Sequence, residues 1–208
     1  MLGNFYGIGV GPGSSDLLTV RAVNVLGKVP VVCIPCSGPD NARVARQIIL
    51  PYISETTRII EIHTPMTRDT QLLEKAWEEG ANTIVAELRE GYDLAFVTIG
   101  DSTLFSTYTY LKKRIVSDLP DMTIETVPGI TSFSAVTSYL NTALAEGNEK
   151  VAIIPAIDQV DELRPVFEMF PNVVLMKVAN QYEGLVGLLE ELGLKERAVY
   201  VSKLGHPD

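Results

Sequence analysis

The stretch Gly7-Ile8-Gly9-Val10-Gly11-Pro12-Gly13 decides how this sequence folds and what it can bind. It follows a short apolar segment, and its alternating glycines indicate that the backbone closely approaches another group at the end of a strand. It does not match the dinucleotide fingerprint Gly-x-Gly-x-x-Gly, because the count from Gly7 ends on Pro12. Since proline has no N–H to donate to a phosphate, the loop suits close approach but not a pyrophosphate.

Strand-like and helix-like segments alternate along the whole chain. The expected strands are residues 5–10, 29–34, 58–62, 93–99, 123–127, 150–155, 172–177 and 197–201. Helices are expected between them, and the last of these begins with Asn180 as its cap. This alternation predicts an α/β fold with largely parallel sheets, in which ligands bind beyond the carboxyl ends of the strands.

A polar, proline-containing stretch at residues 117–121 predicts a domain boundary. We therefore expect an N-terminal α/β domain of residues 1–118, which carries the glycine-rich loop. A C-terminal α/β domain of residues 119–208 should follow it.

Size and charge narrow the function classes. The chain has 208 residues, of which 46% are hydrophobic, and a net charge of −9. The acidic charge argues against nucleic acid as a partner, because phosphate binding favours a basic face. No apolar run approaches the roughly 20 residues of a membrane span, and no signal pattern opens the chain. We expect a cytoplasmic protein with no membrane partner.

Two cysteines, Cys33 and Cys36, have the spacing of a thiol redox pair. Redox pairs stand at the start of a helix, whereas here Ser37-Gly38-Pro39 intervenes. A zinc site would need two more ligands, and only His63 and His206 could supply them. We expect structural cysteines and no metal, with a thiol redox protein as an alternative.

Four turns after expected strands carry residues suited to chemistry. Besides the opening loop, they are Ile99-Gly100-Asp101-Ser102-Thr103-Leu104, Pro128-Gly129-Ile130-Thr131-Ser132 and Met176-Lys177. Each also has a plainer interpretation, as an ordinary turn, a helix cap or core packing. Their shared position at strand ends favours one ligand site.

With these motifs in this order, the whole chain resembles the tetrapyrrole methylase family, which uses S-adenosylmethionine as methyl donor. A finer resemblance, to precorrin-2 and cobalt-precorrin-2 C20-methyltransferases, rests on residues 65–69, 76–79, 104–111, 128–135 and 144–149. Two features depart from the family. Ser102 stands where a proline usually follows Gly-Asp, and the sequence stops at Asp208 before a final helix and strand, as an incomplete C-terminal domain would.

The resemblance implies two α/β domains with the donor in the cleft between them. The cofactor-binding residues that it implies are Pro12, Ile99, Gly100, Asp101, Leu104, Thr131, Ser132, Met176 and Gly205. Arg68 is expected to bind a carboxylate of the anionic tetrapyrrole substrate, with a solvated surface arginine as the alternative. The macrocycle supplies the carbon nucleophile, so no catalytic residue is assigned.

The leading hypothesis is a homodimeric methyltransferase of corrin (cobalamin) biosynthesis. It would methylate C20 of precorrin-2 or cobalt-precorrin-2 to give the corresponding precorrin-3, with S-adenosylhomocysteine as the second product. One alternative is another methylase of the family, acting at a different tetrapyrrole position or on diphthamide. A second is an inactive S-adenosylmethionine-binding module. The sequence leaves open whether the substrate carries cobalt.

Overall fold

The computed structural model describes residues 1–155 and 158–204, without the side chains of residues 39–41. Its contacts divide the chain into two units, Met1–Ser132 with the segment from Lys203, and Phe133–Ser202. The sequence placed the boundary at 118/119, whereas the contacts divide the chain after Ser132. The reason is that strand β5 (Ile124–Val127) pairs with β1 (Phe5–Gly9) and so belongs to the first sheet.

Five parallel strands form the sheet of the first unit, in the order β3-β2-β4-β1-β5. The other three strands are β2 (Val31–Cys36), β3 (Arg58–His63) and β4 (Leu94–Thr98). Strand β1 therefore lies between β4 and β5. The glycine-rich loop follows β1 at the carboxyl edge of the sheet. It therefore begins between the loops that follow β4 and β5.

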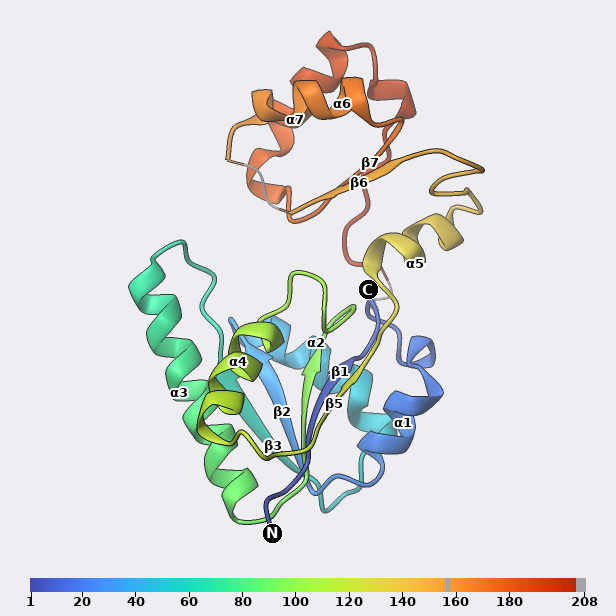
Figure 1. The fold of residues 1–208 in the computed structure, drawn as a ribbon. Coiled ribbons are helices and arrows are strands. Elements are labelled where there is room, and N and C mark those ends of the chain that lie inside the picture. The colour runs from blue at the N-terminus through green and yellow to red at the C-terminus, as the bar shows by residue number, and fades with distance from the viewer. Residues whose placement is uncertain (156–157, 205–208) are drawn as a thin grey trace. The chain divides into compact units, whose positions relative to one another are not determined.

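Helices cover both faces of this sheet (Figure 1). Helices α1 (Val20–Leu26) and α2 (Pro39–Ile49) lie on one face, and α3 (Thr70–Arg89) and α4 (Tyr108–Asp118) on the other. The short 3₁₀ helices η1 (Ser15–Leu17) and η2 (Leu50–Tyr52) complete the unit. The predicted α/β fold with a parallel sheet is confirmed.

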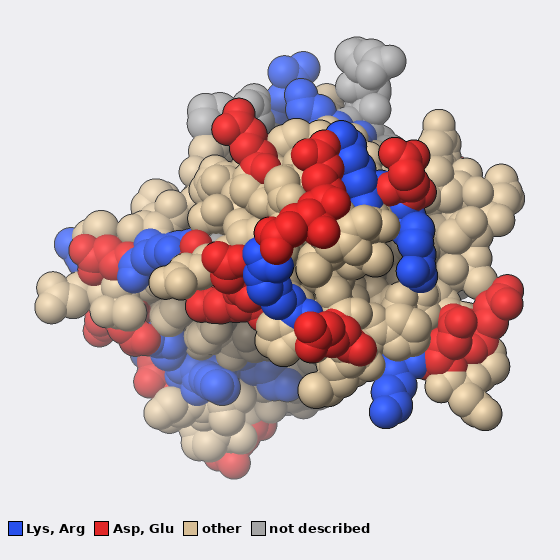
Figure 2. Space-filling view, turned by 90° about the horizontal axis from the view of Figure 1, so that it is seen from above, with Lys and Arg blue, Asp and Glu red and all other residues tan. Residues whose placement is uncertain are grey.

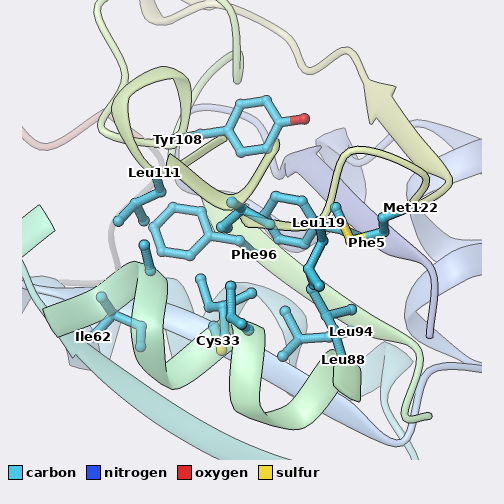
Figure 3. Packing of buried hydrophobic residues seen from close by; sticks show 14 of the residues in the cluster. Phe5, Cys33, Ile62, Leu88, Leu94, Phe96, Tyr108, Leu111, Leu119 and Met122 are labelled. Carbon is cyan, nitrogen blue, oxygen red and sulfur yellow. The ribbon is translucent and has the colours of Figure 1, made fainter. Parts of the chain in front are cut away.

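An apolar layer fills the space between the sheet and each pair of helices. On the α3 and α4 side, Phe96 of β4 packs in one cluster with Leu88 and Leu111 (Figure 3). On the opposite side, Val32 of β2 and Ala45 of α2 belong to a second cluster. Strands buried on both faces need apolar residues at nearly every position, which explains their continuous apolar sequence.

Cys33 lies fully buried in β2, and Cys36 at the end of that strand is half-buried. Burial raises the pKa of the Cys33 thiol, whereas a reactive cysteine needs a lowered pKa and access to solvent. These observations favour the structural role over the redox alternative. Within residues 1–155 and 158–204, no three His, Cys, Asp or Glu side chains gather as a metal site would require.

The second unit is built on a parallel pair of strands, β6 (Val151–Ile154) and β7 (Asn172–Leu175). Its helices are α5 (Ser132–Tyr139), α6 (Arg164–Met169) and α7 (Tyr182–Glu191), with 3₁₀ helices η3 (Val160–Leu163), η4 (Ala179–Gln181) and η5 (Lys195–Arg197). A small core forms around Leu163, Leu185 and Leu188. Among the described helices of both units, none has the length and apolar character to span a bilayer.

Two sequence predictions in this unit are wrong. Residues 197–201 form no strand in the described part of the chain, and Val199 and Tyr200 are exposed. Their β-propensity is not enough without a neighbouring strand edge to pair with. Asn180 is not the cap of the last helix, because it lies inside η4 and α7 begins two residues later.

Gly7 provides a test of this packing. A Cβ built on Gly7 would lie 2.1 Å from Cζ of Tyr108, the buried aromatic residue at the start of α4. We expect Gly7→Ala to lower the free energy of unfolding by about 1–3 kcal/mol, the usual range for overpacking a core. Urea unfolding measures this.

The matched control is Gly27→Ala at the end of α1. Gly27 has an ordinary φ of −70°, and an added Cβ would lie 3.5 Å from its nearest neighbour. Its stability should change by less than about 1 kcal/mol. Equal effects of the two substitutions would contradict the packing described for Gly7.

Candidate functional site

The loops that follow β1 and β4 are bonded to each other at the carboxyl edge of the sheet. The Gly11 N–H donates to the Gly100 carbonyl at 3.2 Å, and the Gly100 N–H donates to the Gly11 carbonyl at 2.7 Å. Both glycines have left-handed backbone, with φ of +78° and +81°. Residues with a Cβ are strained in this region, which explains glycine at both positions.

The loop after β5 packs closely against Gly9 and Gly100 of the other two loops. A Cβ on Gly129 would lie 2.1 Å from the Gly100 carbonyl oxygen, and one on Gly9 would lie 2.6 Å from the Gly129 nitrogen. Neither glycine can therefore be enlarged without moving backbone. The close approach that the opening stretch predicted occurs between the loops of the protein itself.

Asp101 joins two of these loops through its side chain. Its Oδ2 accepts a hydrogen bond from the Gly129 N–H at 2.9 Å. Its Oδ1 accepts from the Thr103 N–H at 2.8 Å and from the Thr103 hydroxyl at 2.5 Å. A carboxylate has about four acceptor positions, so one remains for a further donor. The side chain fixes the loop after β4 to the loop after β5.

Two opposing effects act on the pKa of Asp101. Partial burial acts to raise it, but the hydrogen bonds from the Thr103 hydroxyl, the Gly129 N–H and the Thr103 N–H lower it by more. The resulting pKa lies below the ordinary value. The carboxylate therefore stays ionised at neutral pH and adds a fixed negative charge at this edge of the sheet.

Most of the residues expected to contact the cofactor lie around these loops of the first unit. Pro12 is buried, Ile99 is exposed and Leu104 is half-buried. Thr131 and Ser132 follow Gly129 at the start of α5. The structure thus brings together the strand-end motifs after β1, β4 and β5.

The remaining expected residues stand apart from this group. Met176 belongs to the second unit, directly after β7, where its N–H donates to the Ile154 carbonyl at 2.8 Å. Gly205 lies outside the described residues. Arg68 is exposed in the loop between β3 and α3, and β3 is separated from β1 by β2 and β4.

A hydroxyl network behind the β4 loop was not predicted from the sequence. The Ser106 hydroxyl accepts from the Tyr108 N–H at 3.1 Å and shares a hydrogen bond of 3.1 Å with the Thr98 hydroxyl. The Tyr108 hydroxyl pairs with that of Thr126 on β5 at 2.7 Å. These hydrogen bonds attach the carboxyl-terminal end of the β4 loop to the sheet. Single Ser and Thr residues form no recognisable sequence motif, so the network could not be predicted.

Ser102, the residue that departs from the family pattern, is fully buried. Its Oγ has no hydrogen-bond partner among the described residues. A buried hydroxyl without a partner is unfavourable, which a proline at this position would avoid. The sequence shows that Ser102 departs from the family pattern, but it does not reveal that the side chain is buried.

These features define a class of protein. An open parallel sheet whose central loops are joined at the carboxyl edge is typical of α/β proteins that bind a small ligand there. Pro12 occupies a position where a dinucleotide-binding loop needs glycine. The site is thus that of an α/β ligand-binding protein outside the dinucleotide-binding class.

Comparisons with known proteins identify the family. Residues 4–208 match the model of the Tetrapyrrole (Corrin/Porphyrin) Methylases. A cobalt-precorrin-2 C(20)-methyltransferase of Salmonella typhimurium is 33% identical over 207 residues, which cover 100% of this chain and 86% of the relative. A probable cobalt-precorrin-2 C(20)-methyltransferase of Methanocaldococcus jannaschii is 34% identical over 96% of this chain and 87% of the relative. The chain belongs to the tetrapyrrole methylase family.

A solved structure supports the fold. The uroporphyrin-III C-methyl transferase of Thermus thermophilus, complexed with S-adenyl homocysteine, has a TM-score of 0.63 and 20% identity. The match covers 92% of this chain and 77% of that one.

Replacement of Asp101 tests its role in joining the loops. Asp101→Asn should lower the free energy of unfolding at pH 7, because the carboxylate accepts three hydrogen bonds from two residues. The folded pKa is lowered, so the wild-type advantage should be complete above the ordinary value of 3.8 and lost as pH falls through the folded pKa. Urea unfolding between pH 7 and pH 3 measures it.

Asp121→Asn, which removes the same charge from an exposed position, is the control. It should leave stability at pH 7 nearly unchanged. Equal stability of Asp101→Asn and wild type at pH 7 would show that the carboxylate does not hold the two loops.

Proposed function

We propose that this protein is an S-adenosylmethionine-dependent methyltransferase that methylates C20 of precorrin-2 or cobalt-precorrin-2. The observation that carries the proposal is the identity of 33–34% to two relatives of that name, over essentially the whole chain. The resemblance of residues 65–69 after β3 and 108–111 in α4 to C20-methyltransferases supports it further, because these residues lie outside the loops expected to bind the donor.

The donor-binding residues in this proposal are those carried over from the family. They are Pro12, Ile99, Gly100, Asp101, Leu104, Thr131, Ser132 and Met176, with Gly205 beyond the described residues. The chemistry of the first unit fits such a donor. The loops offer backbone, apolar surface and an ionised carboxylate, which suit a sulfonium cation without phosphates.

Gly100 differs from the other two glycines in the space beside its Cα. A Cβ built on Gly100 would have no heavy atom of the described residues within 4 Å, although Gly9 and Gly129 are tightly packed. We expect the donor to contact the loop backbone on this side of Gly100, next to the exposed Ile99.

When bound, the donor supplies a methyl group, whose bond to sulfur breaks as the bond to the macrocycle carbon forms. The protein residues need mainly to align the two reactants and exclude water. The loops joined through Asp101 and the glycines are suited to this task, because they cannot move independently. No catalytic base is proposed among the residues of this chain.

The substrate carries several carboxylates, and an acidic protein must bind them with locally placed cations. On the face drawn in Figure 2, acidic and basic side chains of the described residues are intermixed. We assign Arg68 to a substrate carboxylate, because the guanidinium fork can donate two parallel hydrogen bonds to a carboxylate.

Two further proposals rest on the family resemblance. We propose that the protein is a homodimer and acts in the cytoplasm. Analytical ultracentrifugation tests the first, since a monomer at micromolar concentration would contradict it.

The direct test uses isotope-labelled donor with precorrin-2, with and without cobalt. We expect one labelled methyl group, located at C20 by NMR of the product. A product labelled at another position would favour a different methylase of the family. Tight donor binding in calorimetry with no turnover on either substrate would favour the inactive binding module.

Arg68→Ala tests the substrate assignment. We expect KM for the tetrapyrrole to rise by about tenfold or more, since charge-assisted hydrogen bonds contribute roughly 1.5–3 kcal/mol. KM for S-adenosylmethionine should not change. Lys75→Ala on the exposed surface of α3 removes the same charge and should behave as wild type. An unchanged tetrapyrrole KM in Arg68→Ala would identify Arg68 as a solvated surface residue.

A further inference from the structure

Phe105 combines an unfavourable backbone conformation with partial exposure to solvent. It lies in the loop between β4 and α4, at the edge of the sheet that carries the candidate site. Its φ is +49°, in the left-handed region, and 42% of the residue is exposed. A bulky residue with positive φ is an outlier, and such strain tends to occur at functional sites.

The loop is held on both sides of Phe105. On the amino-terminal side, Asp101 bonds to Thr103 and to Gly129 of the next loop. On the carboxyl-terminal side, the Ser106 hydroxyl bonds to the Thr98 hydroxyl and to the Tyr108 N–H. The backbone at Phe105 therefore cannot relax without breaking one of these attachments.

Another left-handed residue, Asn141, has a conformation that its position at a helix end explains. Asn141 has φ of +52° two residues after the end of α5, where its N–H donates to the Ser138 carbonyl and the next N–H donates to the Thr137 carbonyl. Helices often end with a left-handed residue, and asparagine tolerates this conformation. Phe105 instead precedes a helix, and its residue type is poorly suited to the conformation.

We infer that Phe105 is a specificity-determining residue that presents its ring to one face of the tetrapyrrole macrocycle. This inference rests on the proposed function. A flat conjugated macrocycle has apolar faces and a rim of carboxylates, so it needs an aromatic or apolar contact as well as cations. A ring fixed by a rigid loop loses little conformational freedom on binding.

The position of Phe105 in the chain supports this assignment. It directly follows Leu104, which we assign to the donor, and it is four residues beyond Asp101. A single rigid loop would then contact both reactants. That arrangement would help to align the reacting carbon with the methyl group.

The test compares Phe105→Gly with Phe105→Tyr. Glycine removes the ring and relieves the left-handed strain, whereas tyrosine keeps the ring. We expect Phe105→Gly to have an unchanged or higher Tm and an unchanged Kd for S-adenosylhomocysteine in calorimetry. Its KM for the tetrapyrrole should rise about tenfold, the effect of losing one aromatic contact and its buried area. Phe105→Tyr should keep KM close to that of wild type.

Asn141→Gly is the matched control, because it relieves the same backbone conformation in an exposed residue of the other unit. It should leave both binding constants unchanged. If glycine loosens the loop, Phe105→Asn serves as the second variant, since asparagine accepts positive φ without a ring.

Three results would overturn the inference. The first is an unchanged tetrapyrrole KM in both Phe105→Gly and Phe105→Asn. The second is a loss of S-adenosylhomocysteine affinity as large as the rise in tetrapyrrole KM. The third is a fall in Tm in both ring-deleting variants that Phe105→Tyr does not show. Wild-type protein that neither binds nor methylates a tetrapyrrole would overturn the proposed function as well. If the wild type methylates the tetrapyrrole and the ring-deleting variants have the same tetrapyrrole KM, only the role of Phe105 is overturned.

Discussion

The close approach of three backbone segments, at Gly9, Gly100 and Gly129, is the constraint on which the candidate site depends. There is no room for a Cβ at Gly9 or Gly129, and the left-handed backbone of Gly100 requires glycine as well. The contact holds the loops after β1, β4 and β5 at fixed positions relative to one another. Asp101 strengthens it with a charge-assisted hydrogen bond from one loop to the next.

A rigid edge of this kind suits methyl transfer. The reaction needs two reactants held in line and little proton transfer from the protein, so fixed loops contribute more than a reactive side chain. The same rigidity explains how unfavourable features persist there. The buried Ser102 hydroxyl and the left-handed Phe105 both lie between the attachments at Asp101 and Ser106.

Much of this arrangement could be predicted from the sequence. The alternation of strands and helices gave the α/β class, and the strand-end motifs gave the loops that meet at β1, β4 and β5. The order of the strands could not be predicted, because pairing of β5 with β1 depends on contacts far apart in the chain. The same limit explains the incorrect strand at residues 197–201, since a strand needs a partner that local propensity does not reveal. The role of Asp101 in joining two loops was likewise invisible, as its partner Gly129 lies 28 residues away.

A crystal structure with S-adenosylhomocysteine bound would show directly whether the joined loops after β1, β4 and β5 form the donor site. We expect the ligand to lie against the backbone of residues 99–101, on the side of Gly100 where a Cβ would point, while the hydrogen bond from Gly129 to Asp101 remains in place. A ligand bound elsewhere, or an Asp101 carboxylate that leaves Gly129 to reach the ligand, would contradict this expectation.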